Sequence, residues 1–456
     1  MRLRVTIVAL MAAFLGWGVW LLQPALAVAV GLTSHELCDG VFIADQSPQV
    51  VFRTNLAPRK GYDWIAWAIH YRVNRAPARV TSSLLGAFTA RAVYRKRFGC
   101  LVLHGGPPAE QKLQLSQDRP ALLPRFAGPG VVVPQNAKLK AALDASFDAP
   151  HRRTEAVVVV HDGRIIAERY APGVGPRTPL IGYSATKSVI SALIGILVRE
   201  KKLSLYGPAP VALWAVGGDK RHSISIDELL RMRSGLDFPE TDSGFGRSSR
   251  MLFLKRDMAK YAERTHLEFS PGTHWAYSSA SYLILSQILR NAVGGGPNHV
   301  LGFAQRALFG PLGMTNVHLD FDATGTPVGS TYMLAPARSW ARFGMLYLDH
   351  GVVGGRRILP AGWVRYSTSP SVGTGYGAGW WTERVGKGAN PLHWGLPEVP
   401  ADTFMARGIL GQFVVVVPSE NLVVVRFGLT DEAGRNVNDS RGMGRLVAAV
   451  VAAVGG

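Results

Sequence analysis

The chain contains a single Ser-x-x-Lys sequence, formed by Ser184 and Lys187. A spacing of three residues on a helix places the hydroxyl and the amine on one face, a turn apart. Apolar residues that follow at helical spacing predict a buried helix: Val189, Ile190, Leu193, Ile194, Ile196 and Leu197. Because desolvation lowers the pKa of an amine, Lys187 could take the Ser184 proton and create a nucleophile. Ser-x-x-Lys also arises by chance in long chains, so its partners decide its meaning.

A tyrosine downstream has a position from which it could transfer protons. Tyr277 lies in the run from Pro271 to Ser279, just before a predicted helix over residues 281–291. A phenol in such a loop can reach a cleft, and a nearby ammonium favours its phenolate form. Tyr277 is therefore a candidate general base. The alternative is an aromatic side chain that only anchors the loop on the helix below it.

Residues 404–413 predict a glycine-containing strand near the end of the chain. Acyl transfer requires two backbone N–H groups that point at the developing oxyanion. The nucleophile's own residue usually supplies one of them. The N–H of Ile409 could supply the other, because Gly408 places no side chain in the way. The alternative is that Gly408 only eases a bulge or close packing in the sheet.

Two predicted hairpins, far apart in the sequence, would form the scaffold for these residues. The first joins residues 156–160 to 164–170 through His161-Asp162-Gly163, and the second joins residues 411–417 to 422–428. Besides the Ser184 helix, helices are predicted over residues 138–147, 226–232, 250–264, 281–291, 300–309 and 440–454. We therefore predict one antiparallel sheet that is completed by both ends of the domain and covered by helices.

Together these segments resemble the serine β-lactamase and penicillin-binding-protein superfamily. The Ser-x-x-Lys helix, a loop similar to Tyr-x-Asn and a strand similar to Lys-Thr-Gly occur in the family's order. Further segments look like the branch of class C β-lactamases, esterases and 6-aminohexanoate-oligomer hydrolases: residues 229–236, 271–278, 308–314, 340–344 and 376–380. The resemblance implies a β-lactamase/transpeptidase-like α/β (α+β) sandwich over residues 151–456, with an antiparallel sheet flanked by helices and an inserted, mainly helical lobe.

The resemblance also implies a serine hydrolase that forms an acyl-enzyme. Ser184 would be the nucleophile, Lys187 its proton partner, and Tyr277 the base that also protonates the leaving group. The backbone N–H groups of Ser184 and Ile409, beside Gly408, would bind the oxyanion. No metal and no cofactor is implied.

Two positions depart from the family pattern. Ser279 stands where an Asn usually contacts the substrate or the lysine, and Ala406-Arg407-Gly408 replaces Lys-Thr-Gly. Alternation along a strand puts Arg407 opposite Ala406, so we do not expect it to replace the lost cation in the cleft. Both departures favour a small-molecule amide or ester over a β-lactam. The alternatives are a binding protein or sensor for β-lactams or cell-wall fragments, or a D-amino-peptide carboxypeptidase or β-lactamase, that uses the same cleft.

Residues 1–34 predict export, as a signal anchor or a signal peptide. Two arginines precede an uncharged stretch, and residues 5–22 contain one polar side chain, which meets the guide of about 18 residues for a membrane span. Ala25-Leu26-Ala27 is a fair signal-peptidase site, and Gln23-Pro24 is expected to end the helix. The length of the apolar run favours an uncleaved anchor, which would place the rest of the protein in the periplasm or on the extracytoplasmic face of the membrane. With cleavage the protein would be secreted.

Residues 35–150 are expected to form a basic segment and linker. The chain carries a net charge of +19, and ten Lys and Arg residues between Arg53 and Arg97 face a single acidic residue. No nucleic-acid motif accompanies this charge, so we expect a solvated or membrane-adjacent face and no nucleic-acid partner. Cys38 and Cys100 are predicted to form one disulfide, because an isolated pair in an exported chain is most simply bonded. The sequence does not indicate an oligomeric state.

Overall fold

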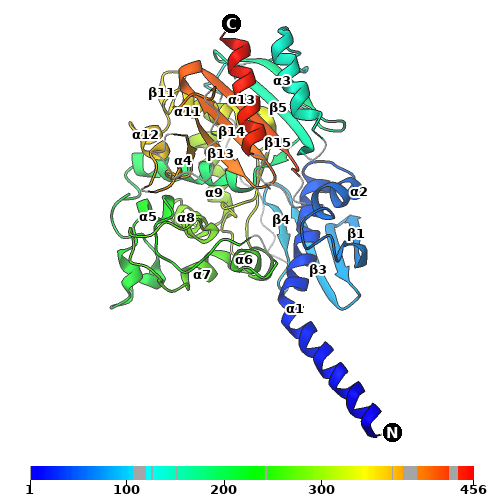
Figure 1. Cartoon of the computed structure of the whole chain (residues 1–456). Coiled ribbons are helices and arrows are strands. Elements are labelled where there is room, and N and C mark those ends of the chain that lie inside the picture. Colours follow the sequence, from blue (N-terminus) through cyan, green and yellow to red (C-terminus); the bar gives the residue numbers. More distant parts are fainter. Residues whose placement is uncertain are drawn as a thin grey trace.

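A computed structural model describes the chain over residues 2–105, 120–124, 127–149, 152–241, 244–371, 373–383, 398–430 and 440–455. A central sheet lies between two layers of helices, and a mainly helical lobe and a second, smaller sheet lie below it (Figure 1). A long N-terminal helix runs along the smaller sheet and extends away from the body.

The central sheet has six antiparallel strands in the order β12-β13-β14-β15-β5-β6. They are β5 (Thr154–His161), β6 (Arg164–Tyr170), β12 (Trp381–Thr382), β13 (Phe404–Gly408), β14 (Gln412–Val417) and β15 (Leu422–Gly428). β15 pairs with β5, so that Val425 lies opposite Val158 where the two ends of the domain meet. Both predicted hairpins, and the single sheet that contains them, are confirmed.

Runs of valine form these strands because both faces of the sheet are covered. Val414 and Val416 face the layer of α4 (Thr186–Arg199) and α11 (Ala337–Leu348). Val415 and Val417 face α3 (Ala137–Phe147) and α13 (Ser440–Val454) on the other side. β-Branched side chains fit a pleated surface, and a strand that is buried on both faces needs no polar alternation.

The lobe between α4 and α11 is mainly helical, as predicted. Its helices are α5 (Ile226–Leu230), α6 (Arg247–Leu254), α7 (Met258–Glu263), α8 (Ser279–Ala292), α9 (Pro297–Ala304), the π-helical turn η7 (Gln305–Phe309) and α10 (Gly310–Leu312). The single helix expected over residues 250–264 is wrong, because the chain breaks between α6 and α7. Asp257 accepts the backbone N–H of Lys260 at 2.9 Å, and this cap starts a new helix.

Short elements complete the domain. β7 (Leu180–Ile181), β9 (Met333–Ala335) and β8 (His318–Leu319) form a three-stranded sheet, and β10 (Val352–Val353) pairs with β11 (Arg356–Arg357). The remaining helical pieces are η5 (Ala212–Trp214), η6 (Lys220–Ser223), α12 (Trp363–Thr368) and η8 (Pro418–Glu420).

Residues 21–105, which we call the N-terminal module, fold around α1 (Arg2–Phe42). Its sheet has the order β1-β2-β3-β4, and the elements after α1 are α2 (Pro48–Val51), η1 (Phe52–Leu56), η2 (Ala66–Ala68), β1 (Ile69–Arg75), β2 (Ala78–Leu84), β3 (Phe88–Arg95) and β4 (Gly99–Val102). The predicted disulfide joins Cys38 of α1 to Cys100 of β4. The sequence indicated no strands in this basic segment, and the domain boundary expected at residue 34 falls inside α1.

α1 continues through Pro24, so the expectation that Gln23-Pro24 ends the helix is wrong. Proline removes one backbone hydrogen bond, but the residues beyond it, from Val28 onward, are buried and hold the helix in place. Among the residues whose side chains the structure describes, one helical stretch, Leu21–Phe42, is long and apolar enough to cross a membrane. Most of that stretch is buried inside the protein, so it serves mainly as a core helix.

Candidate active site

Ser184 lies in the 3₁₀ turn η4 (Tyr183–Ala185), directly before α4. Tyr183 has a φ of 43°, in the left-handed region, where a non-glycine residue costs on the order of 1–3 kcal/mol. The N–H of Gly182 donates to the carbonyl of Met333 at 2.9 Å, which ties the turn to β9. The turn thus holds a half-buried Ser184 at the start of a buried helix.

Lys187 is almost fully buried behind Ser184, with 1% of its surface exposed. Its Nζ donates to Ser184 Oγ at 2.8 Å, to Ser279 Oγ at 3.3 Å and to the carbonyl of Ser330 at 2.8 Å. These oxygens compensate the loss of water around the amine. The structure therefore brings together the Ser184 and Lys187 pair that the spacing predicted, and adds Ser279 to it.

Ser279 links Lys187 to a carboxylate that the sequence did not indicate. The Ser279 Oγ donates to Glu240 Oε1 at 2.8 Å, and the Ser279 N–H donates to Glu240 Oε2 at 2.8 Å. This N–H is free to do so because the first N–H groups of a helix have no partner within it. Ser248 of α6 donates to the same Oε2 at 3.0 Å. Glu240 lies in a loop without a motif, so only the fold reveals it.

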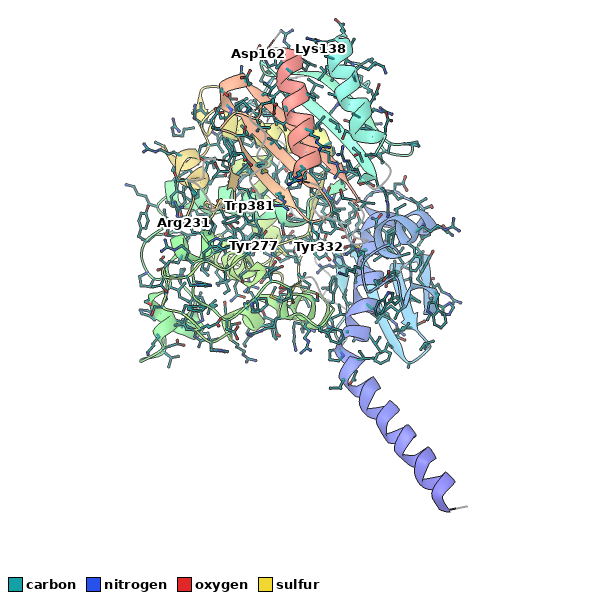
Figure 2. All side chains as sticks on the ribbon, in the orientation of Figure 1. Lys138, Asp162, Arg231, Tyr277, Tyr332 and Trp381 are labelled. Atoms are coloured by element: carbon teal, nitrogen blue, oxygen red, sulfur yellow. A yellow bond between two sulfur atoms is a disulfide. The ribbon has the colours of Figure 1, made fainter. Side chains whose placement is uncertain are left out.

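Tyr277 is held beside Lys187 by aromatic packing. The Lys187 Nζ lies 5.0 Å from the centroid of the Tyr277 ring. That ring stacks on Trp381 of β12 with centroids 5.6 Å apart and meets Tyr376 edge-on at 5.8 Å. Figure 2 labels Tyr277 and Trp381 at neighbouring places between the sheet and the lobe. Tyr277 is half-buried, so this position suits both alternatives, a loop anchor and a proton-transfer group. Trp381 and Tyr376 were not among the predicted site residues.

The end of β13 lies directly against the Ser184 turn. A β-carbon at Gly408 would collide with the carbonyl oxygen of Gly182 and crowd the side chain of Tyr183, so only glycine permits this approach. Ile409 follows and packs with Tyr183 in a small apolar cluster. Gly408 therefore does serve close packing. The same packing brings Ile409 beside the turn, and its role in an oxyanion hole stays a prediction.

Arg407 lies on the opposite face of β13 from Ala406, as alternation predicted. It pairs with Phe413, and its guanidinium lies 5.9 Å from the ring centroids of both Phe413 and Trp381. Burial lowers the pKa of Arg407 to about 10, and the charge of a Tyr277 phenolate opposes this shift. Because the attraction is mutual, Arg407 favours the phenolate form of Tyr277.

The N-terminal module reaches the residue next to Ser184. The Tyr183 hydroxyl accepts a hydrogen bond from Arg59 Nη2 at 2.8 Å and donates one to Glu36 Oε2 at 3.1 Å. Burial raises the pKa of Tyr183 well above its usual value, against the effect of Arg59 and together with that of Glu36. The phenol therefore stays protonated and can donate to Glu36. In this way α1 and the segment after it hold the turn that presents Ser184.

A second buried polar group joins α1 to the loop around β8 and β9. The ligand atoms of His35, Asp39 and Asp320 lie within 4.8 Å of one another, so by residue type they could bind a divalent cation. However, the two ring nitrogens face different carboxylates, with Nδ1 3.4 Å from Asp39 and Nε2 3.0 Å from Asp320. The imidazole ring thus lies between two carboxylates, and burial together with the charges of Asp320 and Glu36 raises the pKa of Asp39 well above its usual value. The His35 ring also packs on Tyr332, with centroids 4.2 Å apart, close to Ser330.

Comparison with known sequences agrees with this fold. The profile of the Beta-lactamase family matches residues 139–442, more than half of the chain, and leaves the N-terminal module outside the match. The 6-aminohexanoate-dimer hydrolase of Paenarthrobacter ureafaciens is 24% identical over 222 residues, which cover 46% of this chain and 56% of that enzyme. The chain thus spans little more than half the length of this curated relative.

Two solved structures share the fold. A penicillin-binding-protein homologue from Caulobacter crescentus aligns with a TM-score of 0.53 and 17% identity, over 71% of this chain and 98% of that chain. A family VIII carboxylesterase aligns with a TM-score of 0.51 and 18% identity, over 70% of this chain and 98% of that chain. With the family profile covering the sheet, the lobe and the Ser184 turn, the chain belongs to the Beta-lactamase family.

Proposed function

We propose that the protein hydrolyses an amide or ester bond of a small molecule through an acyl-enzyme on Ser184. The observation that carries this proposal is the 2.8 Å hydrogen bond between Lys187 Nζ and Ser184 Oγ in a site that buries the lysine. A hydroxyl in contact with a buried amine has a base within reach of its proton. The hydrolases among the relatives support the same class of reaction.

The proposed reaction has two halves. Ser184 Oγ attacks the substrate carbonyl carbon as its proton passes to the Lys187 and Tyr277 pair, and the N–H groups of Ser184 and Ile409 stabilise the oxyanion. The bond to the leaving group then breaks, and Tyr277 returns the proton to the departing amine or alcohol. Water next attacks the acyl-enzyme, which releases the carboxylic acid and restores the Ser184 hydroxyl. The net change is the addition of one water across the bond.

Ser279 and Arg407 support a simple amide or ester as the substrate. The Ser279 hydroxyl lies between Lys187 and Glu240, so it cannot offer the donor and acceptor pair of an asparagine side chain. Ala406 stands at the position of the Lys-Thr-Gly lysine. Arg407 lies on the opposite face of β13 from Ala406, so it does not take the place of that lysine. Both features weaken the case for β-lactam hydrolysis.

We also propose that the protein is exported and anchored by the first half of α1. Residues 5–22 are uncharged and follow two arginines, as expected for a segment inserted with its N-terminus inside. The disulfide between Cys38 and Cys100 fits an oxidising compartment outside the cytoplasm.

A fluorophosphonate probe tests the proposed nucleophile. We expect one adduct on Ser184 in the purified protein, no adduct in Ser184→Ala, and an unchanged adduct in the exposed control Ser223→Ala. An unlabelled Ser184 would refute the proposal. A panel of p-nitrophenyl esters, linear amides, D-amino peptides and nitrocefin then identifies the substrate class. Rapid acylation without turnover across this panel would instead favour a binding protein or sensor.

A further inference from the structure

Large apolar side chains are exposed at the end of the molecule where α1 leaves the body. Trp64 and Trp67 are each 80% exposed, and Leu85 is 72% exposed. On α1 itself, Leu21 and Leu22 are 47% and 46% exposed. Where exposed apolar side chains gather on one face of a protein, they mark an interaction surface.

Contacts along α1 show in which direction the strands of the N-terminal sheet run relative to this helix. Ser82 Oγ of β2 donates to the carbonyl of Val30 at 2.6 Å, whereas Tyr94 of β3 stacks on Phe42 with centroids 5.8 Å apart. Ser82 pairs with Ala90, so β3 runs from Ala90 to Tyr94 in the same direction as α1 runs from Val30 to Phe42. The antiparallel β2 therefore runs from Ser82 toward the N-terminal end of α1.

This direction places the turn after β2 at the exit of α1. Leu85 lies three residues beyond Ser82, which is about 10 Å along a strand, or six to seven residues along a helix. Leu85 is thus level with the part of α1 that lies about six to seven residues before Val30. Its N–H donates to the carbonyl of Ala68 at 3.5 Å, and the indole of the adjacent Trp67 donates to the carbonyl of Trp64 at 3.0 Å. Both tryptophans therefore lie beside Leu85.

The lobe contributes a further aromatic residue at the same level. Phe245 is 49% exposed, and it follows Gly244, where a β-carbon would lie 3.4 Å from Cβ of Ala25 on α1. α6 and β3 lie on two sides of α1 in Figure 1. Exposed apolar side chains therefore surround the exit of α1 from both sides.

We propose that Leu21, Leu22, Trp64, Trp67, Leu85 and Phe245 form a seating surface that rests on a lipid bilayer with anionic headgroups. Tryptophan favours the membrane–water interface. Residues 5–22 span about 27 Å as a helix, close to the roughly 30 Å of a hydrocarbon core. Lys60, four residues before Trp64, is exposed and carries a charge that complements anionic headgroups. This inference rests on the proposed anchor and is independent of the hydrolytic chemistry.

The seating surface fixes the distance between the candidate active site and the bilayer. Glu36 lies fourteen residues beyond Leu22 of the seating surface on α1, which corresponds to about 21 Å along the helix. Because Glu36 bonds to Tyr183, the adjacent Ser184 is held in the aqueous layer close to the headgroups. The surface thus directs the enzyme toward substrates in this layer.

Site-directed labelling of the full chain in nanodiscs tests the seating surface. Leu85→Cys and the control Lys138→Cys are each labelled with a polarity-sensitive maleimide dye, which the bonded Cys38 and Cys100 do not take up. Lys138 lies at the end of the molecule opposite the exit of α1 (Figure 2). The nanodiscs contain equal parts of phosphatidylcholine and phosphatidylglycerol, with or without brominated acyl chains.

We expect a blue shift and quenching by brominated lipid for the dye at position 85, and neither for the dye at position 138. Equal behaviour at the two positions would overturn the proposal, as would a mature N-terminus directly after Ala27. As a second measurement, Trp64→Ser combined with Trp67→Ser should reduce the quenching of intrinsic tryptophan fluorescence. Hydrolysis of a soluble ester, followed in the same samples, should not change. If no sample hydrolyses the ester while the quenching is as expected, the result would count against the proposed function and not against the seating surface.

Discussion

The N-terminal module and the Beta-lactamase-family domain (residues 139–442) each place a largely buried arginine close to a tyrosine of the candidate site. Arg59 comes from the module, hydrogen-bonds to Tyr183 and lies 3.4 Å from a carboxylate oxygen of Glu36. Arg407 comes from the central sheet and lies over aromatic rings, and no carboxylate of the described residues lies within ion-pair distance of it. Its electrostatic partner is Tyr277. Arg59 is held by the oxygens of Tyr183 and Glu36, whereas Arg407 acts on Tyr277 through its charge.

This difference separates two ways of supporting a catalytic group. A paired, hydrogen-bonded arginine fixes geometry, because its donors have fixed directions. A desolvated arginine without an acidic partner pays the cost of burial and retains a strong field on its surroundings. We therefore expect Arg59 to affect how well Ser184 is positioned, and Arg407 to affect the protonation of Tyr277.

The Ser184 and Lys187 pair, which both arginines are expected to support indirectly, should show the largest effect when it is broken. Lys187→Ala should lower kcat for a p-nitrophenyl ester by about 100-fold or more, because Ser184 loses its hydrogen-bonded base. Lys202→Ala, at an exposed lysine just beyond α4, is the control and should leave kcat unchanged. A variant of Arg59 or Arg407 that lowers kcat more than Lys187→Ala does would contradict this order of effects.

Arg407→Met should have the next largest effect, about tenfold at neutral pH, the change that corresponds to one pKa unit. Loss of the positive charge raises the pKa of Tyr277, so less phenolate is present at a given pH. The pH–activity curve should therefore move to higher pH, whereas Arg407→Lys should stay close to the native curve. The measurement is kcat over a range of pH. An equal loss at every pH would show that Arg407 only fills space.

Arg59→Met should lower kcat by about fivefold and leave the pH profile in place, because one hydrogen bond contributes about 1 kcal/mol. Tyr183→Phe removes the same bond from the other side and should have a similar effect. If the bond itself matters, the double variant should be no worse than either single variant. Additive losses would mean that the two side chains act separately.

Cys38→Ser combined with Cys100→Ser should have the smallest effect on activity, no larger than that of Arg59→Met. The disulfide closes a sequence separation of 62 residues, and loops of this size contribute about 4 kcal/mol by restricting the unfolded chain. The module should therefore melt earlier, as followed by thermal unfolding with and without reductant. A loss of activity on the scale of Lys187→Ala would mean that the Beta-lactamase-family domain does not fold without the module.

Local patterns explain why much of the Beta-lactamase-family domain is predictable. The turn His161-Asp162-Gly163 and the flanking valine runs lie within a few residues of one another, and the same holds for Ser184 and Lys187. The strands of the N-terminal module are harder to recognise. Their buried face mixes large residues such as Val80 and Leu84 with small ones such as Ser82 and Ala92, and arginines dominate the exposed face. The charge is visible in the sequence, but the hydrophobic alternation that predicts a strand is weak.

The sequence by itself determined the two hairpins of the central sheet, the Ser-x-x-Lys pair and the cysteine pair, because each depends on spacing or on residue type. Only the tertiary structure decided that Glu240 meets Ser279, that the charge of Arg407 acts on Tyr277 and that Glu36 and Arg59 hold Tyr183. These contacts join segments that are far apart in the chain, and a single polar residue in a loop has no periodic pattern. Their geometry follows from how the sheet, the lobe and α1 pack, which no local sequence specifies.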